Sequence, residues 1–301
     1  MSAKGVLQLD SFRLAQYSVQ VPCFICGNGN SFDSELCRHC QAPMALAHQA
    51  NIQKVPPQLV AALGSAGAGK TVYLGMLTDM LSQSGGELQL LARGAFSVSL
   101  QQMTISALAD CEFPDKTPNE PDRWNWIHCQ VRSEKKRHPI ELIIPDLSGE
   151  AILEEIDHPH TYPVIRAFLS KCSGVMILVD AIRLKEGEKD QNFFAMKMIS
   201  YLCELDDDPK RGWPTRPVGV VYTKADQCEP CFNDAAEFAR KHSPGLWQHS
   251  QRFSRCRYFA AGVAGACAMQ MELGGRRLVP LRVEPRGVIE PFQWLVGELE
   301  K

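Results

Sequence analysis

The residues with the most specific spacing in this sequence fit the pattern G-x-x-x-x-G-K-[ST]. They are Gly64, Ser65, Ala66, Gly67, Ala68, Gly69, Lys70 and Thr71. In such a loop, backbone amides cradle phosphates, the lysine reaches the β- and γ-phosphates, and the hydroxyl binds Mg²⁺. The preceding run QLVAALG is typical of a buried strand, and the following VYLGMLTDMLSQ has the apolar spacing of a helix. Strand, glycine loop and helix together predict a phosphate-binding loop.

Two further motifs end predicted strands later in the chain. The stretch IIPDLSGE carries Asp146 and Gly149 as D-x-x-G, where a carboxylate can reach the Mg²⁺ shell and a glycine amide can approach a γ-phosphate. The stretch VVYTKADQ carries Thr223, Lys224 and Asp226 as T-K-x-D. An aspartate there can accept hydrogen bonds from N1–H and N2–H₂ of guanine. Adenine lacks that pair of donors, so an ATPase is disfavoured.

The last strand of this series, YFAAG, ends at Ala260 and Ala261, where a small residue lets a backbone N–H reach the guanine O6. Ligands of open α/β sheets bind at the carboxyl ends of the strands, so these motifs predict one site. Apolar strands alternate with helices, which predicts an α/β fold: a P-loop NTPase G domain with a mostly parallel sheet covered on both faces. Helices are expected at 94–110, 191–205, 232–242 and 289–301, strands at 124–133, 140–146, 172–181, 217–223 and 256–260, a solvated basic turn at 135–137, and a short strand pair at 275–287.

Four cysteines lie close together near the start of the chain. Cys23, Cys26, Cys37 and Cys40 form two CxxC pairs separated by ten residues, and two such knuckles complete the all-sulfur tetrahedron that Zn²⁺ prefers. A ribbon this small has too little core to fold without its metal. We therefore expect an N-terminal segment with a zinc ribbon at 1–48, a linker at 49–57, and a G domain at 58–301 with an insertion at about 87–123.

Composition limits the classes of protein that the chain can belong to. The 301 residues carry a net charge of −2, which gives no electrostatic case for nucleic acid or an anionic membrane. We expect no signal peptide, because the N-terminus has no continuous apolar segment, and no apolar run approaches the length that spans a bilayer. The twelve cysteines are then interpreted as reduced thiols plus a metal site in the cytoplasm.

The four nucleotide motifs, in this order, resemble the Ras-like, translation-factor-related class of P-loop GTPases, over roughly residues 58–301. The four-cysteine ribbon ahead of them and the DLSGE stretch are most similar to the bacterial double-GTPase-type families. The resemblance implies GTP or GDP with Mg²⁺, a nucleotide-dependent switch, and protein partners in a multi-gene signalling or conflict system. It also implies a switch I threonine on Mg²⁺. We choose Thr117, just before the strand at Trp124, over Thr104, which falls inside a predicted helix.

Two positions depart from the pattern of Ras-type enzymes. Glu150 follows D-x-x-G where they carry glutamine, and Ala66 replaces a glycine of the loop. A carboxylate can accept a hydrogen bond from water but adds charge beside the γ-phosphate, so we expect slow hydrolysis that is relieved by a residue supplied in trans. The candidate catalytic residues are Lys70, Thr71, Glu150 and Thr117.

Two other functions stay open on the sequence alone. The chain can be a scaffold that binds guanine nucleotides without turning them over, an alternative that Glu150 supports. It can also be a nucleic-acid-associated protein, but the ribbon carries only Arg38 as a cation against Asp33 and Glu35.

Several other residues have a functional and a structural interpretation. His158 and His160 lie where a mobile switch II is expected and can position water, although an exposed loop is the simpler interpretation. Arg183 can act near the base or lie in a solvated loop. Cys228 and Cys231 form a third CxxC that we interpret as the start of a helix rather than a metal or redox site. We expect Trp124 and Trp126, on one face of their strand, to pack in the core.

Overall fold

A computed structural model of the chain describes residues 19–52, 56–83, 85–134, 138–206, 214–272 and 275–299. The basic run at 135–137 and part of the expected linker, residues 53–55, lie outside the described residues. Among the described helices, none combines the length and the apolar character that crossing a bilayer requires.

A seven-stranded sheet forms the centre of the molecule, with strand order β4-β5-β6-β3-β7-β8-β9. Its parallel strands are β3 (Gln58–Gly64), β6 (Ile140–Asp146), β7 (Gly174–Asp180), β8 (Val218–Thr223) and β9 (Cys256–Ala260). At one side of the sheet, β5 (Asn125–Ser133) pairs antiparallel with β6, and β4 (Leu88–Ala92) pairs antiparallel with β5. Every residue of β7 and β8 is buried, as continuous apolar runs require when both faces of a sheet are covered. This confirms the predicted fold class.

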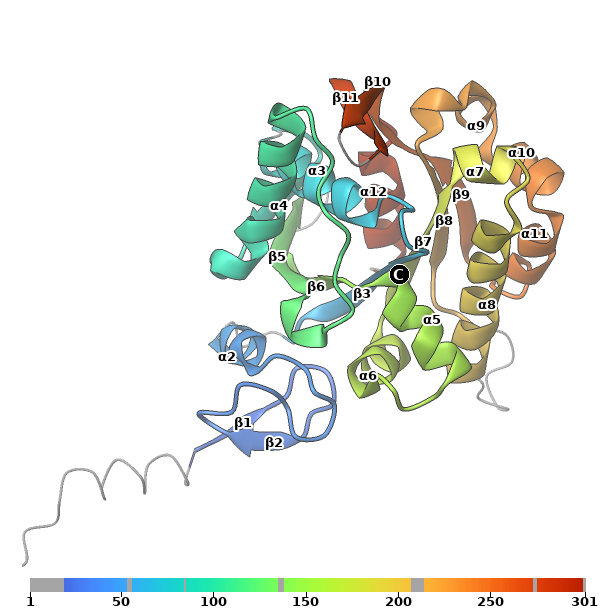
Figure 1. The fold of residues 1–301 in the computed structure, drawn as a ribbon. Helices are drawn as coiled ribbons and strands as arrows, with labels where there is room; N and C mark the ends of the chain where they lie inside the picture. The colour runs from blue at the N-terminus through green and yellow to red at the C-terminus, as the bar shows by residue number, and fades with distance from the viewer. Residues whose placement is uncertain are drawn as a thin grey trace, which may run out of the picture.

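Helices cover both faces of the sheet (Figure 1). One layer contains α5 (Gly149–Asp157), α6 (Pro163–Lys171), α8 (Lys189–Leu205), α10 (Ala235–His242) and α11 (Pro244–Ser250), and the other contains α3 (Lys70–Gln83), α4 (Gly94–Ala109) and α12 (Ile289–Leu299). The short α7 (Ala181–Lys185), α9 (Glu229–Asn233), η1 (Pro121–Arg123) and η2 (Ala225–Gln227) lie in the connections. The single helix expected at 232–242 is wrong. Asp234 separates α9 from α10 and caps α10 by accepting the N–H of Glu237 at 2.9 Å.

The segment at 87–123 contributes to the main sheet and to one helix layer. The sequence predicted the helix α4 but not β4, which pairs with β5 along all five of its residues. The short run LQLLA alternates buried and exposed side chains, a pattern too brief to separate from a loop by periodicity alone.

The N-terminal ribbon consists of β1 (Gln20–Pro22) paired with β2 (Gly29–Ser31), followed by α2 (Met44–Ile52). The sequence analysis did not predict α2, which begins at Met44 within the expected ribbon segment and extends past residue 48 into the expected linker. The ribbon packs on the G domain: the Phe24 ring meets the Trp126 ring edge-on, with centroids 5.8 Å apart. Trp126 also contacts Phe168 of α6 edge-on.

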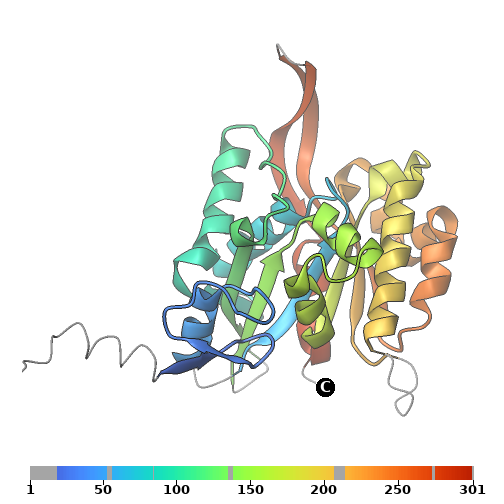
Figure 2. The ribbon, with the colours of Figure 1, turned by 60° about the horizontal axis from the view of Figure 1, so that its bottom comes forward.

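A long hairpin follows β9 and extends away from the sheet (Figure 2). Its strands are β10 (Gly262–Glu272) and β11 (Gly275–Arg286), paired antiparallel with bulges near the base. The prediction of a strand pair within 275–287 was wrong, because this stretch is a single strand whose partner precedes it. The partner sequence GVAGACAMQME is rich in glycine and alanine, so it lacks the β-branched pattern of a strand.

Candidate nucleotide-binding site

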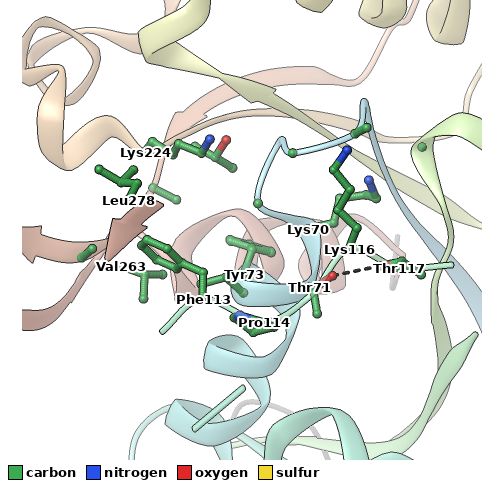
Figure 3. Close-up of a pocket in the computed structure, with 18 of the residues that line it drawn as sticks. Lys70, Thr71, Tyr73, Phe113, Pro114, Lys116, Thr117, Lys224, Val263 and Leu278 are labelled. Carbon is green, nitrogen blue, oxygen red and sulfur yellow. Dashed lines mark hydrogen bonds between the residues drawn. The ribbon is translucent and has the colours of Figure 1, made fainter. Parts of the chain in front are cut away.

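A cavity of about 260 Å³ opens at the carboxyl ends of the parallel strands. Its walls come from four segments: the loop at 66–73, the segment 113–117, the start of α5, and the T-K-x-D stretch with the base of the β10–β11 hairpin. Figure 3 shows Phe113 and Val263 at one end of this cavity and Lys70 and Thr71 at the other. Motifs that are far apart in the sequence therefore line one space, as the strand-end argument predicted.

The glycine-rich loop has the backbone shape that its sequence predicts. Gly67 and Gly69 have φ values of 75° and 81°, a backbone conformation that residues other than glycine rarely adopt. The Nζ of Lys70 donates to the carbonyl oxygens of Gly64 at 2.8 Å and Ser65 at 3.2 Å. Burial lowers the pKa of Lys70 to about 8, although Asp146 and Glu150 oppose this shift. A buried ammonium that donates to backbone carbonyl oxygens is well placed for an anionic ligand.

The hydroxyls of Thr71 and Thr117 and the carboxylate of Asp146 meet below this loop. Thr71 Oγ1 donates to Asp146 Oδ2 at 2.9 Å, Thr117 Oγ1 donates to the same oxygen at 3.0 Å, and the two hydroxyls are 3.1 Å apart. Among the residues that the structure describes, Asp146 Oδ1 is buried without a hydrogen-bond partner. Burial raises the pKa of Asp146. Two hydroxyl oxygens and a buried carboxylate thus lie together, which fits Mg²⁺, an ion that prefers oxygen ligands.

Thr117 belongs to a segment that is attached to the site at several points. Trp124 Nε1 donates to the carbonyl oxygen of Pro118 at 2.8 Å, and Ser148 of D-x-x-G donates to Asn119 Oδ1 at 2.5 Å. The alternative threonine, Thr104, is fully buried on α4 and packs against Gly75 of α3. Of the two threonines considered, only Thr117 is brought to the loop.

The glycine of D-x-x-G lies against the phosphate-binding loop. A Cβ on Gly149 would stand 2.5 Å from the Gly64 carbonyl oxygen and 2.7 Å from the Ala66 amide nitrogen, so only glycine fits there. Gly149 is also the first residue of α5, whose N-cap is Ser148. The next residue, Glu150, lines the cavity, and one of its oxygens accepts from Asn119 Nδ2 at 3.3 Å.

The T-K-x-D stretch lies at the other end of the cavity. Thr223 Oγ1 donates to the carbonyl oxygen of Ala68 at 2.7 Å, which joins this stretch to the phosphate-binding loop. The N–H of Ala225 donates to the Ala261 carbonyl oxygen at 3.1 Å. Asp226 lines the cavity beside Ala261, whereas Ala260 closes β9 and does not line it. Burial raises the pKa of Asp226.

Asp180, at the end of β7, is a site residue that the sequence analysis did not find. It is fully buried, and its Oδ2 accepts from Lys224 Nζ at 2.6 Å. Its Oδ1 accepts the N–H groups of Ile182 and Arg183, which caps α7. The sequence did contain a signal for Asp180: an aspartate follows the apolar run GVMILV, at the carboxyl end of a predicted strand, where the other motifs also lie.

The remaining candidates lie away from the cavity lining. His158 is the C-cap of α5, and His160 is exposed in the following loop. Cys228 and Cys231 are buried, with their sulfurs 3.4 Å apart at the start of α9, and the described residues offer them no further ligands of a metal cluster. Both Trp124 and Trp126 are buried as predicted.

The four cysteines of the ribbon converge on one point. Their sulfur atoms all lie within 4.8 Å of one another, and the Cys23–Cys40 and Cys26–Cys37 pairs are each 3.6 Å apart. A tetrahedral Zn²⁺ with Zn–S bonds of about 2.3 Å would separate its sulfurs by about 3.8 Å. The hydrogen bond with Cys23, followed by burial, raises the pKa of Cys40. Four thiols at one point, three of them buried, fit a divalent cation.

Comparison with known proteins agrees with this geometry. Residues 58–262 match the family model described as Double-GTPase 2. The chain belongs to this family. This match confirms the resemblance drawn from the motifs, and together the family and the G-domain fold support GTP binding.

Among solved structures, a crystal structure of an S. thermophilus NFeoB mutant bound to GDP is similar, with 14% sequence identity over 68% of this chain and 55% of that chain, and a TM-score of 0.30. The search of curated protein sequences found no match.

Proposed function

We propose that this Double-GTPase 2 chain binds GTP and GDP with Mg²⁺, hydrolyses GTP slowly, and acts as a switch that a protein partner reads. The observation that carries the proposal is the contact of Thr117 with Thr71 and Asp146. It joins a loop segment to the phosphate-binding loop and to D-x-x-G at one point. A segment attached there can be ordered by one nucleotide and released by another.

Each motif has a role in this proposal. Amides of residues 66–71 would hold the α- and β-phosphates, with Lys70 between the β- and γ-phosphates. Thr71, Thr117 and Asp146 would hold Mg²⁺, which neutralises phosphate charge when bound. Asp226 would accept the N1–H and N2–H₂ of guanine, with the stem of Lys224 over the base and Ala261 beside it.

Glu150 is the reason to expect slow turnover. Its carboxylate stands where it can accept a hydrogen bond from an attacking water, but it cannot donate to the γ-phosphate oxygens. The side chain is 56% exposed, which leaves room for a residue from a partner to complete the site. The second candidate function, a nucleotide-binding scaffold without turnover, rests on the same residue.

The ribbon is proposed as a zinc-bound module that stabilises the G domain or docks a partner. It shares a core with the G domain through Phe24 and Trp126, so a partner bound to the ribbon would act on a module that is packed against the G domain. We place this switch in the cytoplasm, in a regulatory or conflict-type system, with neither a membrane nor a nucleic acid as its partner.

Single-turnover phosphate release from GTP tests the proposal. We expect hydrolysis that depends on Mg²⁺ and is slower than about 0.01 per second without a partner. Thr117→Ala should lower that rate at least about tenfold, whereas Thr215→Ala, an exposed threonine before β8, should leave it unchanged. GTP binding without any phosphate release would favour the scaffold instead.

A further inference from the structure

We propose that Lys116 is a cation that this chain itself presents to the γ-phosphate of GTP, opposite Glu150. The inference rests on the proposed function, because it concerns the same site. Charge on the γ-phosphate oxygens has to be stabilised during hydrolysis, and the negative Glu150 carboxylate close by increases the charge to be balanced. Lys116 would supply the positive group.

The position of Lys116 follows from its neighbour. Thr117 is attached to Thr71 and Asp146 by hydrogen bonds of about 3 Å, so the backbone one residue earlier lies at the rim of the phosphate end of the cavity. Both Lys116 and Glu150 line that cavity, together with Lys70. In Figure 3, the side chains of Lys70 and Lys116 both extend from their backbones toward the phosphate-binding loop.

The charge of Lys116 is available to a ligand. Its Nζ lies 4.0 Å from Glu150 Oε1, and the two side chains are 78% and 56% exposed. Ion pairs this long and this exposed contribute little to stability, so the ammonium can move to a phosphate group of higher charge. Asn119 Nδ2 donates to the other oxygen of the Glu150 carboxylate, Oε2, at 3.3 Å, so this carboxylate has a second partner when the ammonium moves.

Arg183 is a further cation beside the loop, and its geometry suits this role less well. Its terminal nitrogens lie 3.6 and 3.8 Å from where a Cβ on Gly67 would stand. The residue does not line the cavity, and its Nε lies 3.7 Å from Asp180 and 3.8 Å from Glu188. Lys116 is therefore the better placed of the two.

Hydrolysis of GTP is favoured by a positive charge beside the γ-phosphate oxygens. In hydrolysis, the oxygen of water bonds to the γ-phosphorus, and the bond to the β–γ bridging oxygen breaks. That oxygen leaves with the electron pair as part of GDP, and the water protons pass to the phosphate product and the solvent. An ammonium beside the γ-oxygens stabilises the charge that they carry in the transition state. It also offsets the negative charge of Glu150 close by.

The test combines two measurements on the full chain with Mg²⁺: the affinities for GDP and for a non-hydrolysable GTP analogue, and the single-turnover rate with GTP. Lys116→Met should leave GDP affinity unchanged while weakening the GTP analogue about tenfold. It should slow hydrolysis by about 10- to 100-fold. Lys116→Arg should retain most of both properties, because it keeps the charge.

Two controls separate this role from a structural one. Lys171→Met removes an exposed charge at the end of α6 and should change neither quantity. Adding Glu150→Gln to Lys116→Met should recover part of the lost analogue affinity, because the unbalanced carboxylate is removed. Equal losses of GDP and analogue affinity in Lys116→Met, or no change in affinity or rate, would overturn the inference. If the wild-type chain binds both nucleotides without hydrolysis, the proposed turnover fails, and the affinity ratio still decides the role of Lys116.

Discussion

The ammonium of Lys70 is buried, and its hydrogen bonds go to two backbone carbonyl oxygens. With its pKa lowered to about 8, a fraction of the ligand-free protein holds this side chain neutral near physiological pH. Phosphates placed beside it favour the charged form and raise its pKa again. Nucleotide binding should therefore take up protons.

The pH dependence of binding follows from that shift. The bound state holds more protons than the free state, so GDP affinity should fall as pH rises through about 8. Calorimetry at about pH 7 and about pH 8, in two buffers of different ionisation enthalpy, measures the uptake. We expect about 0.1 proton at the lower pH and about 0.5 at the higher. No uptake at either pH would show that Lys70 is fully charged without nucleotide.

At the scale of single residues, fixed spacing predicted the parts of the cavity lining that belong to the phosphate-binding loop, D-x-x-G and T-K-x-D. Gly67, Gly69 and Lys70 stand at set distances because one loop must satisfy one group of phosphates. The place of Thr117 depends instead on how a long segment folds back onto Asp146, and no local pattern encodes that. Asp180 was missed because an aspartate at the end of an apolar strand is common and has no motif of its own.

At the scale of elements, strong periodicity or strong turn chemistry decided what the sequence could predict. The buried strands β7 and β8 are continuous apolar runs and were predicted closely. The helix α2 was missed because MALAHQANI has no charged residue and little apolar period, and it is stabilised by packing of Met44 and Leu46 in the ribbon core. The strand β10 was missed because its alanines and glycines resemble a loop.

The ribbon is the element whose metal content is tested most simply. The purified chain should hold about one zinc ion, and Cys40→Ser should remove it and lower the thermal stability of the ribbon. Cys231→Ser is the matched control, because it changes an equally buried CxxC cysteine and should leave the zinc in place. Metal analysis of the three proteins gives the answer, and equal zinc in all of them would place the ion elsewhere.

At the scale of the whole molecule, the order of the motifs was sufficient to predict the fold class. Phosphate-binding loop, D-x-x-G and T-K-x-D each end a strand, and parallel strands bring those ends to one edge. How the ribbon packs on the G domain could not be predicted, because the contact between Phe24 and Trp126 joins residues about a hundred positions apart.

The central claim is that this edge of the sheet holds a guanine nucleotide, with Asp226 reading the base. Competition binding of GDP, XDP and ADP to the wild-type chain and to Asp226→Asn tests it most directly. Xanthine carries a carbonyl oxygen where guanine carries N2–H₂, so an asparagine amide should pair with it. We predict that the wild-type chain prefers GDP over both competitors by about 100-fold or more, and that Asp226→Asn prefers XDP. Equal binding of GDP and ADP to the wild-type chain, or an unchanged preference in Asp226→Asn, would contradict the account.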